Sequence, residues 1–203
     1  MSNLPKGFRG AAIAAGLKSS GALDLTLIVN DGPRFDAAAV YTTNKVVAAP
    51  VIWSREVTKG KLVRAAVLNS GGANACTGPQ GFSDTHQTAE KVGELLNISS
   101  GEVVVCSTGL IGELLPMPKI ISGLVSIATA LKLESLADVS RAIMTTDSVP
   151  KVAVTTVKGA DFAGIAKGAG MLAPALATML SVVMTDAVLP KNAQEIFARV
   201  TDR

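Results

Sequence analysis

Three loops rich in glycine and threonine hold the residues of this sequence that could do chemistry. The first two each follow a predicted strand and cover residues 69–78 (Asn-Ser-Gly-Gly-Ala-Asn-Ala-Cys-Thr-Gly) and 106–112 (Cys-Ser-Thr-Gly-Leu-Ile-Gly). None of the loops has the glycine pattern of a dinucleotide site or a P-loop. In the second, Thr108 and Gly109 can direct a hydroxyl and a backbone N–H at one point, the arrangement that stabilises an oxyanion. A purely structural turn is the alternative interpretation of both loops.

The third loop, residues 166–180, leads into a threonine at the start of an apolar segment. A threonine hydroxyl is a poor nucleophile, but an N-terminal threonine carries its own α-amine, with a pKa of ~8, as an adjacent base. Cleavage between Ala177 and Thr178, by attack of Thr178 on the preceding carbonyl, would create that amine. The residues alone leave open that Thr178 is an ordinary strand residue.

The composition predicts a globular chain with a substantial core and limits the possible partners. Hydrophobic residues make up 48% of the sequence, charged residues 17%, and the net charge is +3, which is too apolar for a disordered chain. The basic residues are scattered and aromatic residues amount to 3%, so no nucleic-acid surface is expected. No group of His, Cys, Asp and Glu has metal-ligand spacing, and we expect no metal site.

Localisation is predicted from an uncharged stretch, the N-terminus and the cysteines. Residues 168–185 carry no charge, but glycines, a proline and hydroxyls interrupt them, so we expect a loop and a buried strand and no membrane helix. No apolar segment typical of a signal peptide follows the N-terminal residues. Cys76 and Cys106 fit neither a disulfide framework nor a zinc pattern, and a thiol enzyme that pairs one of them with His86 is disfavoured. We therefore expect a cytoplasmic protein.

Short β-branched and apolar runs, together with amphipathic segments, must position these loops. The predicted strands are residues 25–29, 37–42, 65–68, 103–107, 152–157 and 178–184. The predicted helices are residues 83–96, 119–131 and 136–144 and one that begins after residue 192, with Ser83, Ser135 and Asn192 as N-caps. Strands and helices mix without strict βαβ alternation, and no linker divides the chain. We expect one α+β domain over residues 1–203, built on a layered sheet.

Four motifs in order resemble the ornithine acetyltransferase family of arginine biosynthesis, whose members are also called bifunctional glutamate N-acetyltransferases. The motifs are residues 69–78, 106–112, 142–147 (Ala-Ile-Met-Thr-Thr-Asp) and 167–180 (Lys-Gly-Ala-Gly-Met-Leu-Ala-Pro-Ala-Leu-Ala-Thr-Met-Leu), with support from residues 16–24 and 41–50. An ordered set of long motifs is far more specific than any single one. The resemblance extends over nearly the whole chain.

The resemblance implies a fold and a processing step. The fold is an α/β sandwich of the aminopeptidase-like N-terminal-nucleophile type. Family members cleave themselves at the bond that corresponds to Ala177–Thr178, so residues 1–177 correspond to the family's α chain and 178–203 to the start of its β chain. Family members continue for about as long again, and relative to them the fold is incomplete at the C-terminus.

The resemblance also implies roles for single residues. Thr178 would be the nucleophile and a substrate contact, Thr108 and Gly109 the oxyanion hole, and Thr145 and Lys167 substrate contacts. A lysine can hold an amino-acid carboxylate, and a hydroxyl with a backbone N–H can stabilise a tetrahedral oxyanion. For Asp147 we expect an N-terminal cap of the following segment rather than a contact with a substrate amine.

The function that follows is a cytoplasmic transferase that moves acetyl from N-acetylornithine to glutamate through an acetylated Thr178. The transfer needs no cofactor, and acetyl-CoA would be a substrate only if the protein also acetylates glutamate directly. The expected partners are the chain's own β half and a second copy, which form a heterotetramer of two α and two β chains. The alternatives are an N-terminal-nucleophile amidase or aminopeptidase, and a truncated, non-catalytic half of the acetyltransferase.

Overall fold

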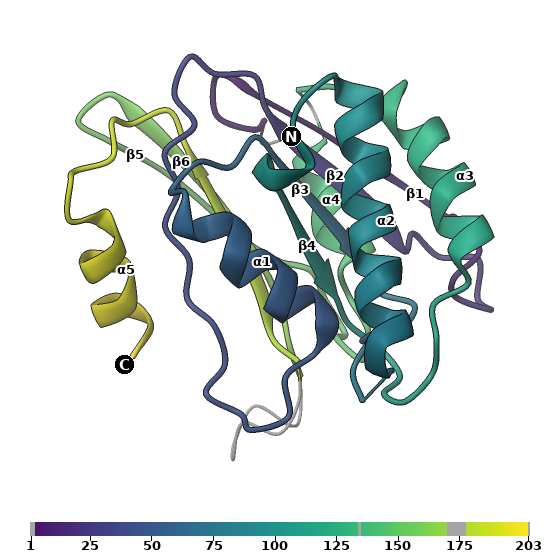
Figure 1. The fold of residues 1–203 in the computed structure, drawn as a ribbon. Coiled ribbons are helices and arrows are strands. Elements are labelled where there is room, and N and C mark those ends of the chain that lie inside the picture. The colour runs from purple at the N-terminus through teal and green to yellow at the C-terminus, as the bar shows by residue number, and fades with distance from the viewer. Residues whose placement is uncertain (1–2, 134, 170–177, 203) are drawn as a thin grey trace.

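The strands of the chain form two β-sheets that share a hydrophobic core, as a computed structural model of residues 3–133, 135–169 and 178–202 shows (Figure 1). The first sheet has the order β1-β2-β3-β4, with the strands Phe8–Ile13, Leu25–Asn30, Ala65–Asn69 and Val103–Ser107. The second has the order β5-β6-β7, with the strands Lys151–Val157, Ala160–Lys167 and Leu180–Thr185. The helices are α1 (Ala49–Lys59), α2 (Gly78–Leu96), α3 (Met117–Ala128), α4 (Leu136–Ala142) and α5 (Ala193–Thr201), and a 3-10 turn, η1, covers Ser100–Glu102.

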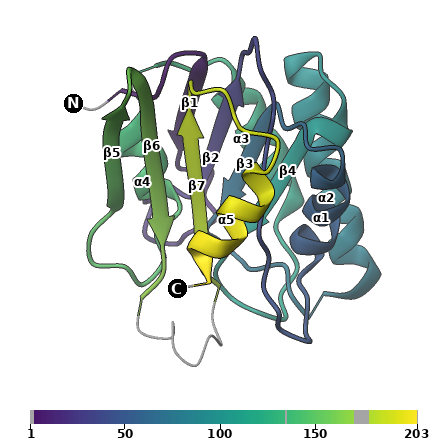
Figure 2. The ribbon, with the colours of Figure 1, turned by 90° about the vertical axis from the view of Figure 1, so that its left-hand side faces the viewer.

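Each face of the first sheet packs against a different layer, because successive side chains of a strand point to opposite faces. On one face Leu27 and Val67 pack with residues of α2 and α3 such as Leu124. On the other face Leu68 packs with α4 and with Ile165 of the second sheet, which lies in front of the first sheet in Figure 2. Helices therefore cover one face, and a second sheet with α4 covers the other. The predicted α+β sandwich class is confirmed.

The parallel pair β3 and β4 determines where the first two glycine-rich loops lie. The two strands pair in parallel with Asn69 opposite Ser107, and α2 forms the crossover that a parallel connection requires. The carboxyl ends of β3 and β4 therefore lie side by side. The loops that leave these two ends must start next to each other.

Helix α1, which was missed by the sequence prediction, covers the free edge of β4. The Ser54 hydroxyl donates to the Val105 carbonyl at 2.8 Å and accepts from the Val105 N–H at 3.0 Å. The Trp53 indole N–H donates to the Val103 carbonyl at 2.9 Å. Side chains thus satisfy backbone groups that an edge strand would otherwise leave unpaired.

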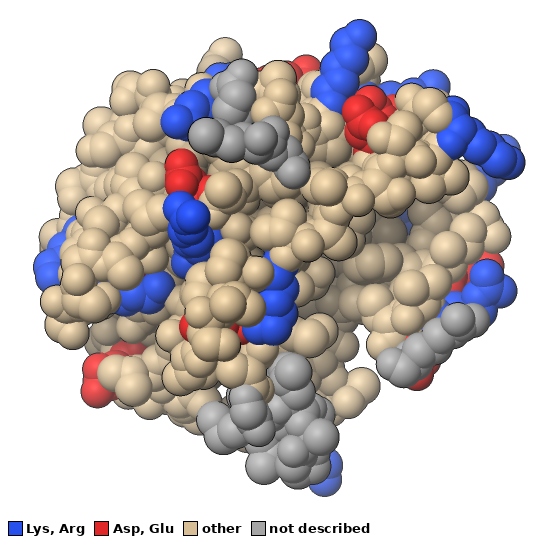
Figure 3. Space-filling model, turned by 180° about the vertical axis from the view of Figure 1, so that it is seen from behind, with Lys and Arg blue, Asp and Glu red and all other residues tan. Residues whose placement is uncertain are grey.

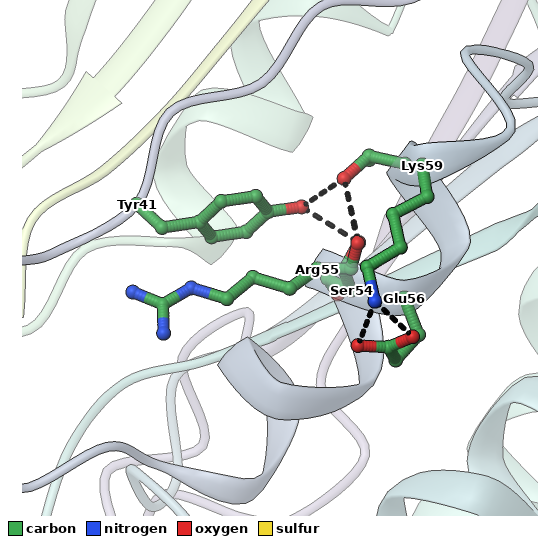
Figure 4. Close-up of polar contacts among 6 residues, drawn as sticks. Tyr41, Ser54, Arg55, Glu56 and Lys59 are labelled. Carbon is green, nitrogen blue, oxygen red and sulfur yellow. Dashed lines mark hydrogen bonds and ion pairs between the residues drawn. The ribbon is translucent and has the colours of Figure 1, made fainter.

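The predicted strand 37–42 is wrong, because side chains and not a neighbouring strand hold this segment. The Tyr41 hydroxyl donates to the Ser54 carbonyl of α1 at 2.7 Å, and the Arg55 guanidinium lies 5.5 Å from the Tyr41 ring centroid (Figure 4). Ala39 exchanges two hydrogen bonds with the side-chain amide of Gln194 in α5. The segment is part of the connection from β2 to α1, and Tyr41 and Ala39 anchor it to α1 and α5.

Other boundaries shift from the predicted ones. Strands β1 and β6 were not predicted, and Thr178 lies two residues before β7 instead of within it. Helix α2 begins at Gly78, so Ser83 lies inside the helix and does not cap it. Ser135 and Asn192 occupy the N-cap positions of α4 and α5, but neither side chain makes a capping hydrogen bond.

Charged side chains are dispersed on the face seen from behind, where separate groups of Lys and Arg and fewer Asp and Glu lie on a mainly uncharged surface (Figure 3). This distribution gives that face no large field of one sign.

Within residues 3–133, 135–169 and 178–202, no helix has both the length and the hydropathy needed to cross a membrane.

Truncating Leu124 tests the core beneath α3. Leu124 is 0% exposed, whereas its neighbour Val125 is 46% exposed. We expect Leu124→Ala to lower the free energy of unfolding by about 2–5 kcal/mol through lost burial and a cavity, and Val125→Ala to change it by no more than about 0.5 kcal/mol. Urea denaturation of both variants measures the difference. Equal effects would contradict the assigned orientation of α3.

Candidate acyl-transfer site

The first two glycine-rich loops meet at the carboxyl ends of β3 and β4. Gly72 forms isolated bridges with Thr108 and Leu110, and the Ala73 N–H donates to the Leu110 carbonyl at 2.7 Å. The Thr108 N–H donates to the Asn69 carbonyl at 3.0 Å. The parallel strand pair therefore continues as a pair of hydrogen-bonded loops, which orients Thr108 and Gly109.

Gly109 must be glycine where the two loops touch. Its φ is +132°, in the region that side chains disfavour, and a Cβ atom would lie 2.8 Å from the Gly72 nitrogen. Because the Thr108 N–H is already bound to Asn69, the backbone donor that this Thr-Gly pair can offer to an oxyanion is the Gly109 N–H. The Thr108 contribution would come from its hydroxyl.

Lys167 connects the second sheet to these loops. It is the last residue of β6, and strand alternation turns its side chain inward on the same face as Ala163 and Ile165. The residue is 4% exposed. Its Nζ donates to the Thr145 hydroxyl at 2.6 Å, to the Thr108 hydroxyl at 3.0 Å and to the Thr178 carbonyl at 3.4 Å. One buried ammonium group thus joins three segments that lie far apart in the sequence.

Asp147 lies next to Lys167 and accepts hydrogen bonds from three directions. Its carboxylate accepts from the Gly168 N–H at 2.8 Å and the Thr145 N–H at 3.2 Å, and it forms an ion pair with Lys151. Burial would raise the pKa of Asp147, but the Lys151 ammonium and the two N–H donors outweigh burial and lower the pKa to about 2. The expected N-cap role of Asp147 is wrong, because the element that follows is strand β5.

A second lysine fixes the segment before Thr145. The Lys18 ammonium donates to the Met144 carbonyl at 2.8 Å and to the Leu23 carbonyl at 2.9 Å. The loop that carries Lys18 is held by buried Asp24, which accepts the backbone N–H groups of residues 15, 17 and 18. Residues 16–24, which support the family resemblance, therefore contact the site through the hydrogen bond from Lys18 to Met144.

Burial lowers the pKa values of both lysines. For Lys167, burial is the largest cause, the charge of Asp147 opposes it, and the charge of Lys151 adds to it. For Lys18, burial is again the largest cause, Asp24 opposes it, and Lys167 adds to it. Lys167 is thus a poorly hydrated cation beside two hydroxyls, suited to bind a carboxylate or to stabilise a developing oxyanion.

The structure brings together four of the residues singled out in the sequence: Thr108, Thr145, Lys167 and Thr178. Gly109 lies beside them in the chain, and Ala177 falls outside the described residues. The contact of Lys18 with this site was not predicted from the sequence, and Asp147 was predicted to be an N-terminal cap. Asp147 lies two positions after Thr145, close enough in the chain for its carboxylate to accept the N–H of that threonine.

The residues of the alternative thiol site lie in other surroundings. Burial raises the pKa of the Cys106 thiol to about 12, which keeps it protonated and unreactive at neutral pH. The His86 ring lies edge-on to Trp53, with the ring centroids 4.9 Å apart, and 3.4 Å from a Glu90 oxygen. Within the described residues, no three or more His, Cys, Asp and Glu side chains are grouped so as to hold a metal ion.

Comparison with known proteins identifies the family. The family model described as the ArgJ family matches residues 9–203. The chain belongs to the ArgJ family. It is 54% identical to the arginine biosynthesis bifunctional protein ArgJ of Streptomyces avermitilis and 55% identical to that of Streptomyces coelicolor, over 98% of this chain in each case. Only 52% of each of those proteins is covered, so the chain spans about half the length of the curated ArgJ relatives it matches.

Two solved structures share the ArgJ fold. The ornithine acetyltransferase of Mycobacterium tuberculosis, solved in complex with ornithine, matches with a TM-score of 0.77 and 46% identity, over 87% of this chain and 94% of that chain. The ArgJ protein of Bacillus halodurans matches with a TM-score of 0.75 and 38% identity, over 87% and 92% of the two chains. At these identities the similarity extends to sequence as well as fold.

The low pKa of Asp147 predicts a pH-dependent contribution to stability. The ionised carboxylate stabilises the folded chain above pH 4, and this contribution of about 2 kcal/mol is lost as the pH falls from about 4 to 2. We expect the stability difference between wild type and Asp147→Asn, measured by urea denaturation, to be about 2 kcal/mol larger at pH 6 than at pH 2. A difference that does not change with pH would contradict the assigned hydrogen bonds.

Proposed function

We propose that this chain carries the acyl-transfer centre of an acetyltransferase of arginine biosynthesis that moves acetyl from N-acetylornithine to glutamate. One observation carries the proposal: the buried Lys167 ammonium donates to the hydroxyls of Thr108 and Thr145 and to the carbonyl of Thr178. These are the residues for which the family resemblance implies roles in oxyanion stabilisation, substrate binding and nucleophilic attack. Membership of the ArgJ family supports the same assignment.

The proposed chemistry begins when the Thr178 hydroxyl attacks the Ala177 carbonyl and the C–N bond between the two residues breaks, which leaves an ester. Water hydrolyses this ester, so that Ala177 ends in a carboxylate and Thr178 has a free hydroxyl and a free α-amine. That amine takes the proton of the Thr178 hydroxyl, whose oxygen attacks the acetyl carbonyl of N-acetylornithine. The Thr108 hydroxyl and the Gly109 N–H stabilise the tetrahedral oxyanion. The C–N bond then breaks, the ornithine amine leaves with the proton, and acetyl remains as an ester on Thr178. The amine of glutamate attacks this ester, and N-acetylglutamate is released.

Substrate binding in this proposal uses Lys167 and Thr145. An ammonium group favours the carboxylate that N-acetylornithine and glutamate share, and the Thr145 hydroxyl at 2.6 Å is oriented by the same ammonium. The Mycobacterium tuberculosis relative was solved with ornithine, which supports an ornithine-type substrate here. No cofactor takes part in the transfer, and acetyl-CoA would be an acetyl donor only for direct acetylation of glutamate.

The proposed site also includes residues that correspond to the second half of the relatives. The curated relatives are about twice as long, and we propose that the equivalent of their second half adds further substrate contacts. After cleavage, residues 1–177 would form the α chain, and the β chain would begin at Thr178. Two copies of each would assemble into a heterotetramer in the cytoplasm.

Substitution of Thr178 tests the nucleophile. We expect Thr178→Ala to abolish both cleavage and transfer, because the hydroxyl is lost, whereas Thr178→Ser keeps a hydroxyl and retains both in part. The intact mass of the denatured chain reports cleavage, and conversion of N-acetylornithine and glutamate by the full-length protein reports transfer. Transfer activity in Thr178→Ala would rule out the mechanism.

Substitution of Thr108 tests the oxyanion hole. We expect Thr108→Ala to slow cleavage and transfer by about 10²-fold, in line with the loss of one oxyanion donor. Thr146→Ala, at an exposed threonine beside the site, serves as the control and should leave both rates near those of wild type. Rates of acetylglutamate formation at saturating substrate measure the effect. Release of acetate in place of acetylglutamate would indicate an amidase, in which water accepts the acyl group.

A further inference from the structure

The Asp147 carboxylate accepts hydrogen bonds at or next to both of the proposed substrate-binding residues, Thr145 and Lys167. One donor is the backbone N–H of Thr145, and another is the backbone N–H of Gly168, the residue that follows Lys167. The third partner, Lys151, begins strand β5. The Asp147 side chain is 1% exposed, whereas that of its partner Lys151 is 45% exposed, so it is the carboxylate itself that is shielded from water. One buried carboxylate thus ties the irregular segment 144–147 to the ends of two strands.

We propose that Asp147 is a positioning residue: its carboxylate holds the backbone of Thr145 against the end of β6 and so presents the Lys167 ammonium to the hydroxyls of Thr108 and Thr145. Its part in acetyl transfer rests on the function proposed above. The part of Asp147 in orienting Lys167 is independent of that function, because it is inferred only from the hydrogen bonds to Thr145 and Gly168.

The geometry separates this role from simple support of the fold. Lys18 already donates to the Met144 carbonyl, so the segment has an anchor that does not involve Asp147. What Asp147 adds is a link between the two residues that would contact substrate, together with a negative charge beside the buried cation. A carboxylate is the group that offers enough acceptor sites for three donors at once.

The charge of Lys167 gives this role a measurable signature. The charged groups that face Lys167 are Asp147 from the segment after α4, Lys151 from β5 and Lys18 from the loop between β1 and β2. The α-amine that cleavage would create belongs to Thr178, whose carbonyl accepts a hydrogen bond from Lys167 at 3.4 Å. Asp147 is the anion of this set, and its charge favours the ammonium form of Lys167. Removing that charge lowers the pKa of Lys167, whereas removing a carboxylate that does not face Lys167 leaves the pKa unchanged.

The first measurement uses the chain without a substitution at Asp147. The backbone amide protons of Thr145 and Gly168, followed by NMR from pH 6 to pH 1.5, should shift together with one acidic midpoint. That midpoint should match the Asp147 pKa of about 2. The uncut form is obtained with Thr178→Ala, so that no new amine titrates. Amide shifts that do not follow a common midpoint would overturn the proposal, whatever the variants below do.

The second measurement compares two Asp→Asn variants. With ¹³C-labelled lysine, and with the Lys167 signal assigned through its loss in Lys167→Arg, we expect Asp147→Asn to lower the Lys167 midpoint. Asp138→Asn, which removes an exposed carboxylate from α4, should leave it unchanged. An unchanged midpoint in folded Asp147→Asn overturns the proposal. If Asp147→Asn does not fold, the amide measurement decides.

The transfer assay distinguishes this inference from the proposed function. If both hold, the alkaline limb of kcat/KM in Asp147→Asn moves to lower pH in parallel with the Lys167 midpoint, and KM rises more than kcat falls. If the NMR results are as expected and the full-length protein transfers no acetyl group, the proposed function fails while the positioning of Lys167 stands.

Discussion

The burial of the Lys167 ammonium is the constraint on which the site depends. A buried ammonium costs several kcal/mol unless oxygen atoms and a counter-charge replace its water. Here the oxygens come from Thr108, Thr145 and Thr178, and the charge comes from Asp147. Each lies on a different loop or strand end from Lys167. The requirement to satisfy one cation therefore brings the termini of β4, β6 and β7 and the segment after α4 to a common point.

The sandwich architecture makes this convergence possible. The α2 crossover places the ends of β3 and β4 side by side, so the two glycine-rich loops pair with each other. The second sheet packs on the face of the first that carries Leu68, and strand alternation then turns Lys167 inward at the end of β6. Helix α1 seals the free edge of β4 through Ser54 and Trp53. The chemistry rests on loops, while rigid strands determine where those loops begin.

The strands were predicted correctly where the intrinsic preference of the residues agrees with the conformation they adopt in the folded structure. The β-branched strands β2, β3, β4 and β5 were found within one residue at each end. Strands β1 (Phe-Arg-Gly-Ala-Ala-Ile) and β6 (Ala-Asp-Phe-Ala-Gly-Ile-Ala-Lys) were missed, because small residues carry little intrinsic strand preference and these two form by pairing with neighbours. Segment 37–42 shows the opposite case. Its residues favour a strand, but the Tyr41 hydroxyl donates to the Ser54 carbonyl of α1, and the Ala39 N–H donates to the Gln194 side chain of α5.

The sequence by itself determined the chemical inventory: the Thr-Gly pair at Thr108, the threonine at Thr178, the lysine at Lys167 and the family to which these motifs belong. Only the tertiary structure decided that one ammonium group bridges three of the segments, and that Asp147 links Thr145 to the end of β6 instead of capping a helix. The physical reason is the range of the interactions. Composition and spacing describe residues that are close in the sequence. The burial of a charge, and the hydrogen bonds and counter-charge that compensate for it, depend on atoms that come into contact only when the two sheets pack.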